Sequence, residues 1–142
     1  MKIWLYLPFL VTLSSCIQAD TTLKAPENSY CQIIDKVINL PELQQYFHVN
    51  VYPERIPLIV LAEHFISKCS KLNKFGKPIK IVSSNNEIDP SSIEYLKLTK
   101  VNISLVNAEI TFSYKPEGVK GKVKLKKEKS QWAVSESQIV EM

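Results

Sequence analysis

Two different spacings of apolar residues divide the chain. Apolar side chains recur at steps of three and four in residues 27–39 and again in 57–72, which predicts a helix in each segment. Residues 41–47 begin with proline and predict a second short helix. From Lys77 onward the period changes to two, which predicts strands. The expected order is therefore helices first and strands afterwards.

The segment 57–72 has the clearest helical pattern and also a competing interpretation. Its apolar stripe is formed by Leu58, Leu61, Ala62, Phe65, Cys69 and Leu72. Ile59 and Val60 are β-branched, so a strand over 56–61 is the alternative. A short strand is also expected over 48–52, where apolar and polar residues alternate.

Five strands are expected in the second half of the chain, at 77–83, 92–104, 107–115, 118–126 and 131–140. The short connections between the last three require antiparallel neighbours. The expected pairs of the first hairpin are Tyr114–Val119, Phe112–Gly121, Ile110–Val123 and Glu109–Lys124, so that an aromatic ring covers the glycine. After a four-residue turn, "KEKS", the last strand should place Trp132 opposite Leu125 and Val134 opposite Val123.

These elements predict an α+β fold, with N-terminal helices packed on a curved antiparallel sheet of four to five strands. The order of elements, and the late tryptophan in "QWAVSESQIVE", resemble the cystatin-like and nuclear-transport-factor-like folds. The resemblance spans most of the chain after its leader and includes no diagnostic motif. It implies a cone-shaped cavity, in a group of folds that hosts enzymes, binders and adaptors alike.

The amino terminus has the pattern of an export signal. Lys2 precedes an apolar run, "IWLYLPFLVTL", which is too short to span a membrane. The run ends in "LSSC", which resembles the lipobox of bacterial lipoproteins. The resemblance implies cleavage before Cys16 and lipidation of that cysteine. The expected organisation is a signal peptide at 1–15, a lipidated tether at 16–27 and one domain at 28–142.

The same resemblance gives the protein an expected location. Ile17, rather than aspartate, follows the lipidated cysteine, and by analogy with enteric lipoproteins this favours the outer membrane, facing the periplasm. Cleavage after Ala19 is the alternative, and it would release a soluble periplasmic protein. Cys31 and Cys69 then remain as an even pair in an exported chain, either joined as a disulfide or buried as two free thiols.

The charge pattern indicates one candidate surface. The formal charge is +4, and 17 of the 18 basic residues are lysine, with Arg55 the exception. This composition speaks against a nucleic-acid partner, because base and phosphate recognition relies heavily on arginine. A row of lysines lies on one face of the expected hairpin: Lys115, Lys120, Lys122, Lys124 and Lys126. It could bind an acidic protein or anionic headgroups, or it could keep the sheet soluble and protect it from edge pairing.

Residues with catalytic or metal-binding chemistry are scarce. The two histidines have no second ligand at metal spacing, no GxSxG sequence is present, and three glycines are too few for a phosphate-binding loop. We therefore expect a non-catalytic protein without a metal or cofactor. A pocket, if the fold has one, is expected to use His48, Tyr95 and Tyr114.

These patterns favour an envelope lipoprotein that binds a partner protein, such as an immunity-type or envelope-associated adaptor. Toxin-neutralising immunity proteins are similar in being small, exported, anchored and without a catalytic set. The alternative is a binder of a small molecule or lipid that uses a cavity between residues 57–72 and the sheet.

Overall fold

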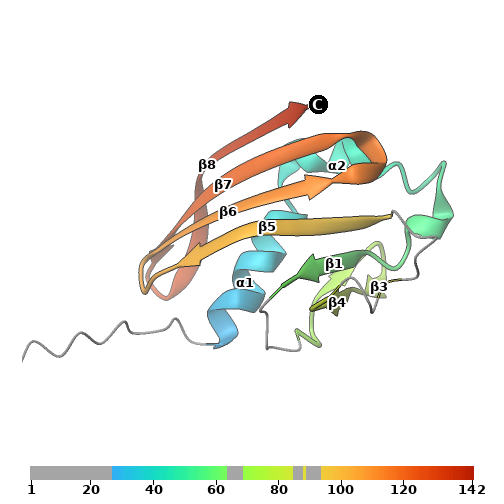
Figure 1. Ribbon diagram of the computed structural model, residues 1–142. Helices are drawn as coiled ribbons and strands as arrows, with labels where there is room; N and C mark the ends of the chain where they lie inside the picture. The colour runs from blue at the N-terminus through green and yellow to red at the C-terminus, as the bar shows by residue number, and fades with distance from the viewer. Residues whose placement is uncertain (1–26, 64–68, 85–87, 89–93) are drawn as a thin grey trace, which may run out of the picture.

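A six-stranded sheet with two helices against one face forms the fold (Figure 1). The computed structural model describes residues 27–63, 69–84, 88 and 94–142. The helical elements are α1 (Glu27–Ile38), α2 (Pro41–Phe47) and the 3-10 turns η1 (Pro53–Arg55) and η3 (Lys115–Glu117). The strands are β1 (Ile59–Ala62), β2 (Asn73–Lys74), β3 (Lys77–Pro78), β4 (Lys80–Val82), β5 (Tyr95–Ile103), β6 (Asn107–Tyr114), β7 (Val119–Glu128) and β8 (Gln131–Glu141).

The large sheet has the strand order β4-β1-β5-β6-β7-β8, and β2 and β3 form a separate small hairpin. Strand β1 runs parallel to both β4 and β5, whereas β5 to β8 form an antiparallel meander. The α+β class is therefore confirmed. The sheet has six strands instead of four or five, and it is mixed rather than purely antiparallel, because β1 and β4 join its side.

The helix expected over 57–72 is wrong in the part that the structure describes. Ile59–Ala62 form β1, close to the alternative strand over 56–61, and residues 64–68 lie outside the described residues. Val60 belongs to the main core, whereas Leu61 belongs to a second cluster with Val82 and Ile88. Both faces of this strand are buried because a different apolar cluster packs on each of them. A continuous apolar run therefore suits it better than a one-sided helical stripe.

The strand expected over 48–52 is also wrong. His48 adopts a left-handed conformation with φ 47° and ends α2. Its carbonyl oxygen accepts hydrogen bonds from the backbone N–H groups of Val51 and Tyr52, both at 2.9 Å. The chain turns here because the helix cap folds the backbone back on itself, and such a turn leaves no extended segment for a sheet to pair.

The register of the hairpin between β6 and β7 is confirmed at every expected pair. Phe112 lies opposite Gly121, and the ladder runs without a break from Tyr114–Val119 to Asn107–Lys126. A Cβ built on Gly121 would overlap the Phe112 ring. The ring therefore occupies the space above the glycine, and any larger residue there would displace it.

The expected register between β7 and β8 is wrong. Gln131 pairs with Glu128, so the loop holds only Lys129 and Ser130, with φ values of 47° and 67°. Two positive φ values are typical of the tight turn that joins twisted strands. Trp132 consequently lies opposite Lys127, and a bulge in β8 between Val134 and Glu136 shifts the register once more, so that Val123 faces Ser137.

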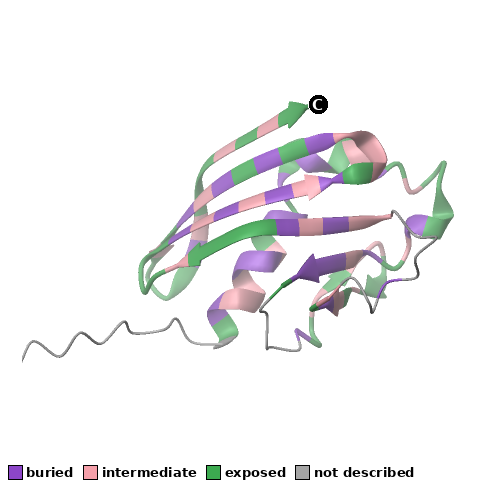
Figure 2. Ribbon diagram, viewed as in Figure 1, coloured by how far each residue is buried: buried purple, intermediate pink, exposed green. Residues whose placement is uncertain are grey.

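The core lies between the helices and the inner face of the meander. Figure 2 shows the alternation of buried and exposed positions along β6 and β7. From α1, Ile33, Val37 and Ile38 are at most 1% exposed. The largest side chains that are buried with them are Phe47, Phe112, Tyr114 and Trp132.

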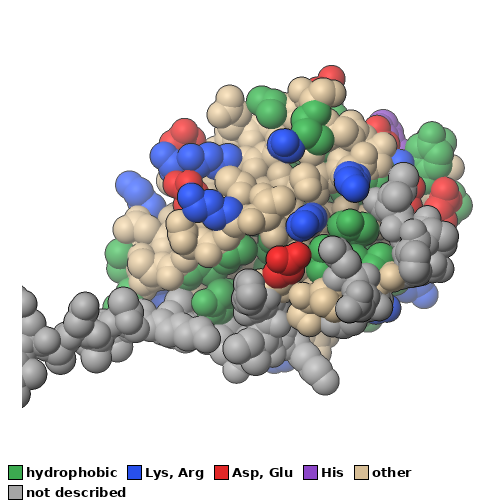
Figure 3. All heavy atoms as spheres, in the orientation of Figure 1, with side chains coloured by type: hydrophobic (Ala, Val, Ile, Leu, Met, Phe, Trp, Pro, Cys, Tyr) green, Lys and Arg blue, Asp and Glu red, His purple; other side chains and the backbone are tan. Residues whose placement is uncertain are grey.

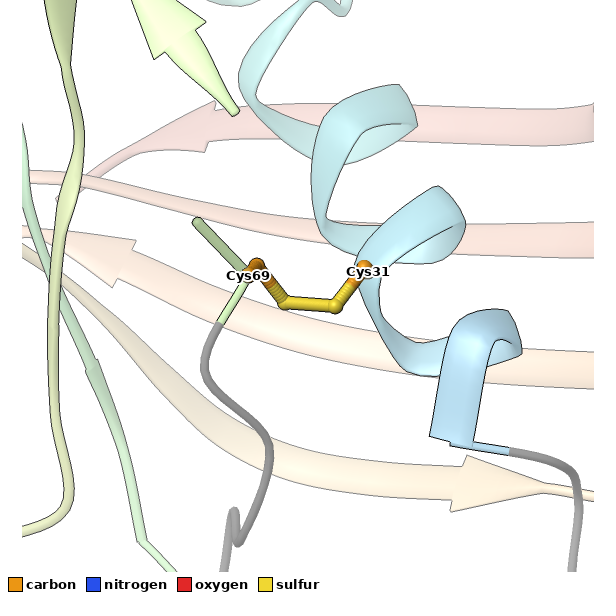
Figure 4. Close-up of a disulfide and its surroundings, with 2 residues drawn as sticks. All are labelled: Cys31 and Cys69. Atoms are coloured by element: carbon orange, nitrogen blue, oxygen red, sulfur yellow. A yellow bond between two sulfur atoms is a disulfide. The ribbon is translucent and has the colours of Figure 1, made fainter. Parts of the chain in front are cut away.

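A disulfide joins α1 to the segment that follows β1 (Figure 4). Cys31 and Cys69 are bonded with an S–S distance of 2.01 Å and a Cα–Cα distance of 5.4 Å, across 38 positions of sequence. The first of the two expected alternatives, a bonded pair, is therefore what the structure contains. Closing a loop of this length stabilises the fold by about 4 kcal/mol on the chain-entropy estimate.

Candidate functional site

The expected lysine row lies on the outer face of the sheet, away from the helices. Along β7, Lys120, Lys122 and Lys126 are exposed, and Lys124 is partly exposed. These lysines alternate with buried Val119, Gly121, Val123 and Leu125, as the period of a half-buried strand requires. Lys115 does not lie on β7, because it begins η3 after β6 has ended. The structure thus brings four of the five predicted lysines onto one strand.

Acidic residues interrupt the positive charge of this row. Lys122 Nζ lies 3.2 Å from Glu109 Oε1, and Lys124 Nζ lies 3.6 Å from Glu136 Oε2. Glu109 stands opposite Lys124 in the ladder, as expected, but its carboxylate reaches the neighbouring Lys122 instead. On the face shown in Figure 3, blue basic side chains accordingly lie beside red carboxylates. The surface is a mixed-charge face rather than a uniform basic ridge.

Arg55 forms a second cluster at the end of the sheet where β5 begins and where η3 leads into β7, and its side chain is 6% exposed. Its Nε donates to Glu94 Oε2 and its Nη1 to Glu117 Oε1, both at 2.7 Å. Nη1 also donates to the carbonyl oxygen of Phe47 at 2.9 Å. The guanidinium lies 4.2 Å from the centroid of the Tyr52 ring. One side chain therefore ties the end of α2 and the turn η1 to the start of β5 and to η3.

The ionisation of this cluster follows from burial and charge. Burial alone would lower the pKa of Arg55, but the hydrogen bonds to Glu117 and Glu94 outweigh it and raise the pKa overall. Burial raises the pKa of Tyr114 to about 12, although the positive charge of Arg55 opposes the rise. Arg55 is therefore a permanent cation held by two carboxylates, and its hydrogen bonds are made to other parts of the same chain.

The three residues expected to share a pocket lie in different places. His48 is exposed, and its Nε2 lies 3.7 Å from Glu117 Oε2 at the rim of the Arg55 cluster. Tyr114 is fully buried, with its ring centroid 5.8 Å from the Arg55 guanidinium. Tyr95 packs against the separate small cluster around Leu61, on the other side of the sheet. Of the three, the structure therefore brings His48 and Tyr114 to the same Arg55 cluster, and Tyr95 lies apart from them.

The helix that was expected to cover a cavity on the sheet is replaced over Ile59–Ala62 by a strand of that sheet, and residues 64–68 lie outside the described residues. The inner face of the meander is filled instead: Phe112 and Trp132 are 1% and 2% exposed, and Phe65 lies outside the described residues. A cleft of about 390 Å³ opens beside the end of β1. It is lined by residues of α1, of the end of β1, of β5 and of β6: Tyr30, Ile33, Ile34, Ala62, Glu63, Lys97, Leu98, Thr99, Lys100, Val101, Ile103 and Ile110. Its lining mixes apolar and charged side chains without a cluster of groups suited to catalysis.

No local pattern in the sequence predicts the Arg55 cluster, but the composition of the chain contains one indication of it. Arg55 is the single arginine among 17 lysines. Arginine is required where a planar fork of donors must reach two carboxylates, a task that lysine cannot perform. A lone arginine in a lysine-rich chain therefore marks a position at which the fork geometry is used.

Comparison with protein-family models, curated protein sequences and solved structures found no match. Within the described residues, no group of three or more His, Cys, Asp or Glu side chains is placed to hold a metal ion. In the same part of the chain, no helix is long and apolar enough to cross a membrane. The function must accordingly be argued from the surface, the core and the disulfide of this chain itself.

Proposed function

We propose that this chain is a non-catalytic envelope lipoprotein that binds a partner protein through the outer face of its sheet. Export is supported by the disulfide between Cys31 and Cys69, since disulfides persist in oxidising compartments. The lipid anchor rests on Cys16 and the lipobox-like "LSSC", which lie outside the described residues. The outer membrane, facing the periplasm, is the location this leader favours, with soluble periplasmic protein after cleavage at Ala19 as the alternative.

The observation that carries partner binding, in preference to ligand binding, is the packing of the interior. A binder of a small molecule needs an enclosed apolar space with a few convergent polar groups. Here the inner face of the meander is occupied by Phe47, Phe112, Tyr114 and Trp132. The outer face, in contrast, carries Thr111 opposite Lys122 and Ser113 opposite Lys120 on paired strands, so its groups are held in fixed positions.

We also propose which fold within the α+β class this chain adopts. A cystatin-like or nuclear-transport-factor-like fold is supported by the order of helices followed by an antiparallel meander that curves around α1 (Figure 1). In this chain α1 has 12 residues and would take the position of the long helix. The buried side chains of α1, Ile33, Val37 and Ile38, fill the concave side of the sheet, which leaves the outer face for the surface binding proposed here.

The anchor and the partner are tested separately. Radiolabelled palmitate should enter the protein in cells, should be lost in Cys16→Ala, and should remain in Cys31→Ala, which removes a cysteine of the folded domain. Absence of label in the unsubstituted protein would support cleavage after Ala19 and a soluble periplasmic protein.

For the partner, a photo-crosslinking amino acid is introduced in cells at Ser113 or Lys122, in the middle of the outer face, and at Val51 as the control. Val51 is 67% exposed and lies in the turn after α2. A single protein adduct common to Ser113 and Lys122, and absent at Val51, is expected. The proposal fails if neither outer-face position yields an adduct, or if Val51 yields the same one.

A further inference from the structure

Strand β8 is an edge strand without lysine, arginine or proline, and a bulge interrupts only its first part. It has 11 residues and pairs only with β7, and no described residue pairs with its other side. Edge strands expose unpaired backbone N–H and C=O groups, and proteins usually blunt them with lysine, proline, bulges or short length. The opposite edge follows this rule, because β4 has three residues and begins with the exposed Lys80. Residues 131–142 contain neither lysine, arginine nor proline.

The accessible part of this edge is its C-terminal half. The bulge after Val134 interrupts pairing near the start of the strand, but Glu136 to Glu141 pair with β7 in unbroken register. None of the residues from Val134 to Met142 is buried. Val134, Val140 and Met142 are 39%, 48% and 66% exposed, which is three of the eight large exposed apolar residues in the part of the chain that the structure describes. The edge therefore combines free backbone groups with apolar surface.

Helix α2 holds this half of the strand in place. Ser137 Oγ donates to Glu42 Oε1 at 3.0 Å, and Tyr46 Oη donates to Glu141 Oε1 at 3.0 Å. These contacts fix the strand from the inner side and leave its outer edge open. A template that is already extended and held loses little conformational entropy when a new strand pairs with it.

The charges along the edge indicate what kind of strand it fits. Glu42, Glu136 and Glu141 lie along this half of β8. Glu42 and Glu141 accept hydrogen bonds from neutral hydroxyls, whereas Glu136, whose side chain is 70% exposed, also contacts Lys124 of β7 at 3.6 Å. A second copy of β8 would bring the same carboxylates to the interface, and like charges across a strand pair are unfavourable. A strand that carries lysine or arginine would meet opposite charge.

We infer that the free edge of β8, from Glu136 to Val140, accepts an extended, lysine- or arginine-bearing segment of the partner protein as a seventh strand of the sheet. The inference rests on the proposed function and adds the place and the chemistry of the partner. Backbone hydrogen bonds supply the affinity, and the carboxylates select the sequence. The outer face then serves as the flat surface beside the added strand.

The test uses a fluorescent peptide of about ten residues, the length of a long strand, in which lysine alternates with threonine and valine. The comparison peptide carries glutamate in place of every lysine. The full chain is titrated with each peptide, and hydrogen exchange of the β8 amides is followed. The lysine peptide is expected to bind and to slow exchange from Glu136 to Val140, whereas the glutamate peptide should do neither.

Two single charge reversals form a matched pair. Glu136 and Glu109 both lie on the outer face and both contact a lysine of β7, but Glu136 is at the edge and Glu109 is on the interior strand β6. Glu136→Lys should weaken binding of the lysine peptide about tenfold, because an attraction becomes a repulsion. Glu109→Lys should change it by less than about twofold. Methylation of alternate peptide amides should abolish binding, since it removes the strand hydrogen bonds.

Each contrary result overturns the inference in a distinct way. Binding of the glutamate peptide alone would assign recognition to the lysine row. Absence of protection on β8 with either peptide would exclude strand addition, and concentration-dependent protection in the protein alone would show that a second copy occupies the edge. If the crosslinks at Ser113 and Lys122 form while the peptide fails, the partner binds the face only. If the peptide binds and the crosslinks fail, the outer face is not part of the interface.

Discussion

Replacing Tyr114 with phenylalanine removes a buried hydroxyl that has no partner. Tyr114 is fully buried, and its Oη has no hydrogen-bond partner among the described residues. A buried polar group without a partner costs about 1–3 kcal/mol of stability. The ring would keep its edge contact with Phe47, at a centroid distance of 5.4 Å. Tyr114→Phe should therefore raise the free energy of unfolding by about 1 kcal/mol, whereas most core substitutions lower it.

The same substitution should change how stability depends on alkaline pH. Burial raises the pKa of Tyr114 in the folded protein to about 12, against 10.0 for the free side chain. Between these values the unfolded chain has lost the proton while the folded protein keeps it, so the free energy of unfolding falls as pH rises. Each pH unit in this range lowers the free energy of unfolding by about 1.4 kcal/mol, which gives a loss of about 2–3 kcal/mol in total. The phenylalanine variant lacks this loss.

The assay is urea unfolding followed by far-ultraviolet circular dichroism, at neutral pH and at steps from pH 9 upward. Tyr46→Phe is the matched control, because it removes a hydroxyl that donates to Glu141. It should lower stability slightly at neutral pH, opposite in sign to Tyr114→Phe. The reasoning is refuted if Tyr114→Phe destabilises the protein at neutral pH, or if it and the unsubstituted protein lose stability equally as pH rises from 10 to 12.

Three further substitutions test the packing, the ion cluster and the disulfide. Gly121→Ala should lower the free energy of unfolding by about 1–3 kcal/mol, because the added methyl group overlaps the Phe112 ring. In the double variant, Phe112→Leu should recover part of that loss. If urea unfolding shows that the two losses simply add, the contact is contradicted. Arg55→Met should lower the free energy of unfolding by about 3 kcal/mol, because two carboxylates lose their cation. Arg55→Lys should give an intermediate value. Equal stability of the two variants and the unsubstituted protein would show that the cluster contributes nothing. The paired replacement of Cys31 and Cys69 by serine should lower the melting temperature as much as reduction does, and a further fall on reducing the serine variant would contradict a single bridge.

The sequence was sufficient to predict strand pairing where two strands that follow one another in the chain are also neighbours in the sheet. The β6–β7 register could be predicted because alternation fixes the faces, and because an aromatic ring and a glycine fit opposite one another. The same approach failed one hairpin later. Lys129 and Ser130 adopt positive φ without being glycine, and the bulge before Glu136 has no clear signature in the residues around it.

Long-range partners decided the elements that the sequence analysis misassigned. An apolar run such as Ile59–Ala62 satisfies a helical stripe and a doubly buried strand equally well. The choice depends on β4 and β5, which flank β1 and come later in the chain. The Arg55 cluster depends on Glu94 and Glu117 in the same way, 39 and 62 positions away. No local window contains those partners, so only the folded chain shows that they meet.

The sheet order also changes the meaning of the lysine row. Protection against edge pairing requires lysines on the outermost strand, whereas the expected pairing of residues 131–140 with 118–126 already places the lysine row on an interior strand. In the structure β8 lies outside β7, so the lysines project from an interior strand and cannot block pairing at the edge. Two of them are bound by Glu109 and Glu136, which leaves a soluble mixed-charge face. The lysines therefore give no protection to the edge formed by β8, which carries a bulge after Val134 and glutamates instead.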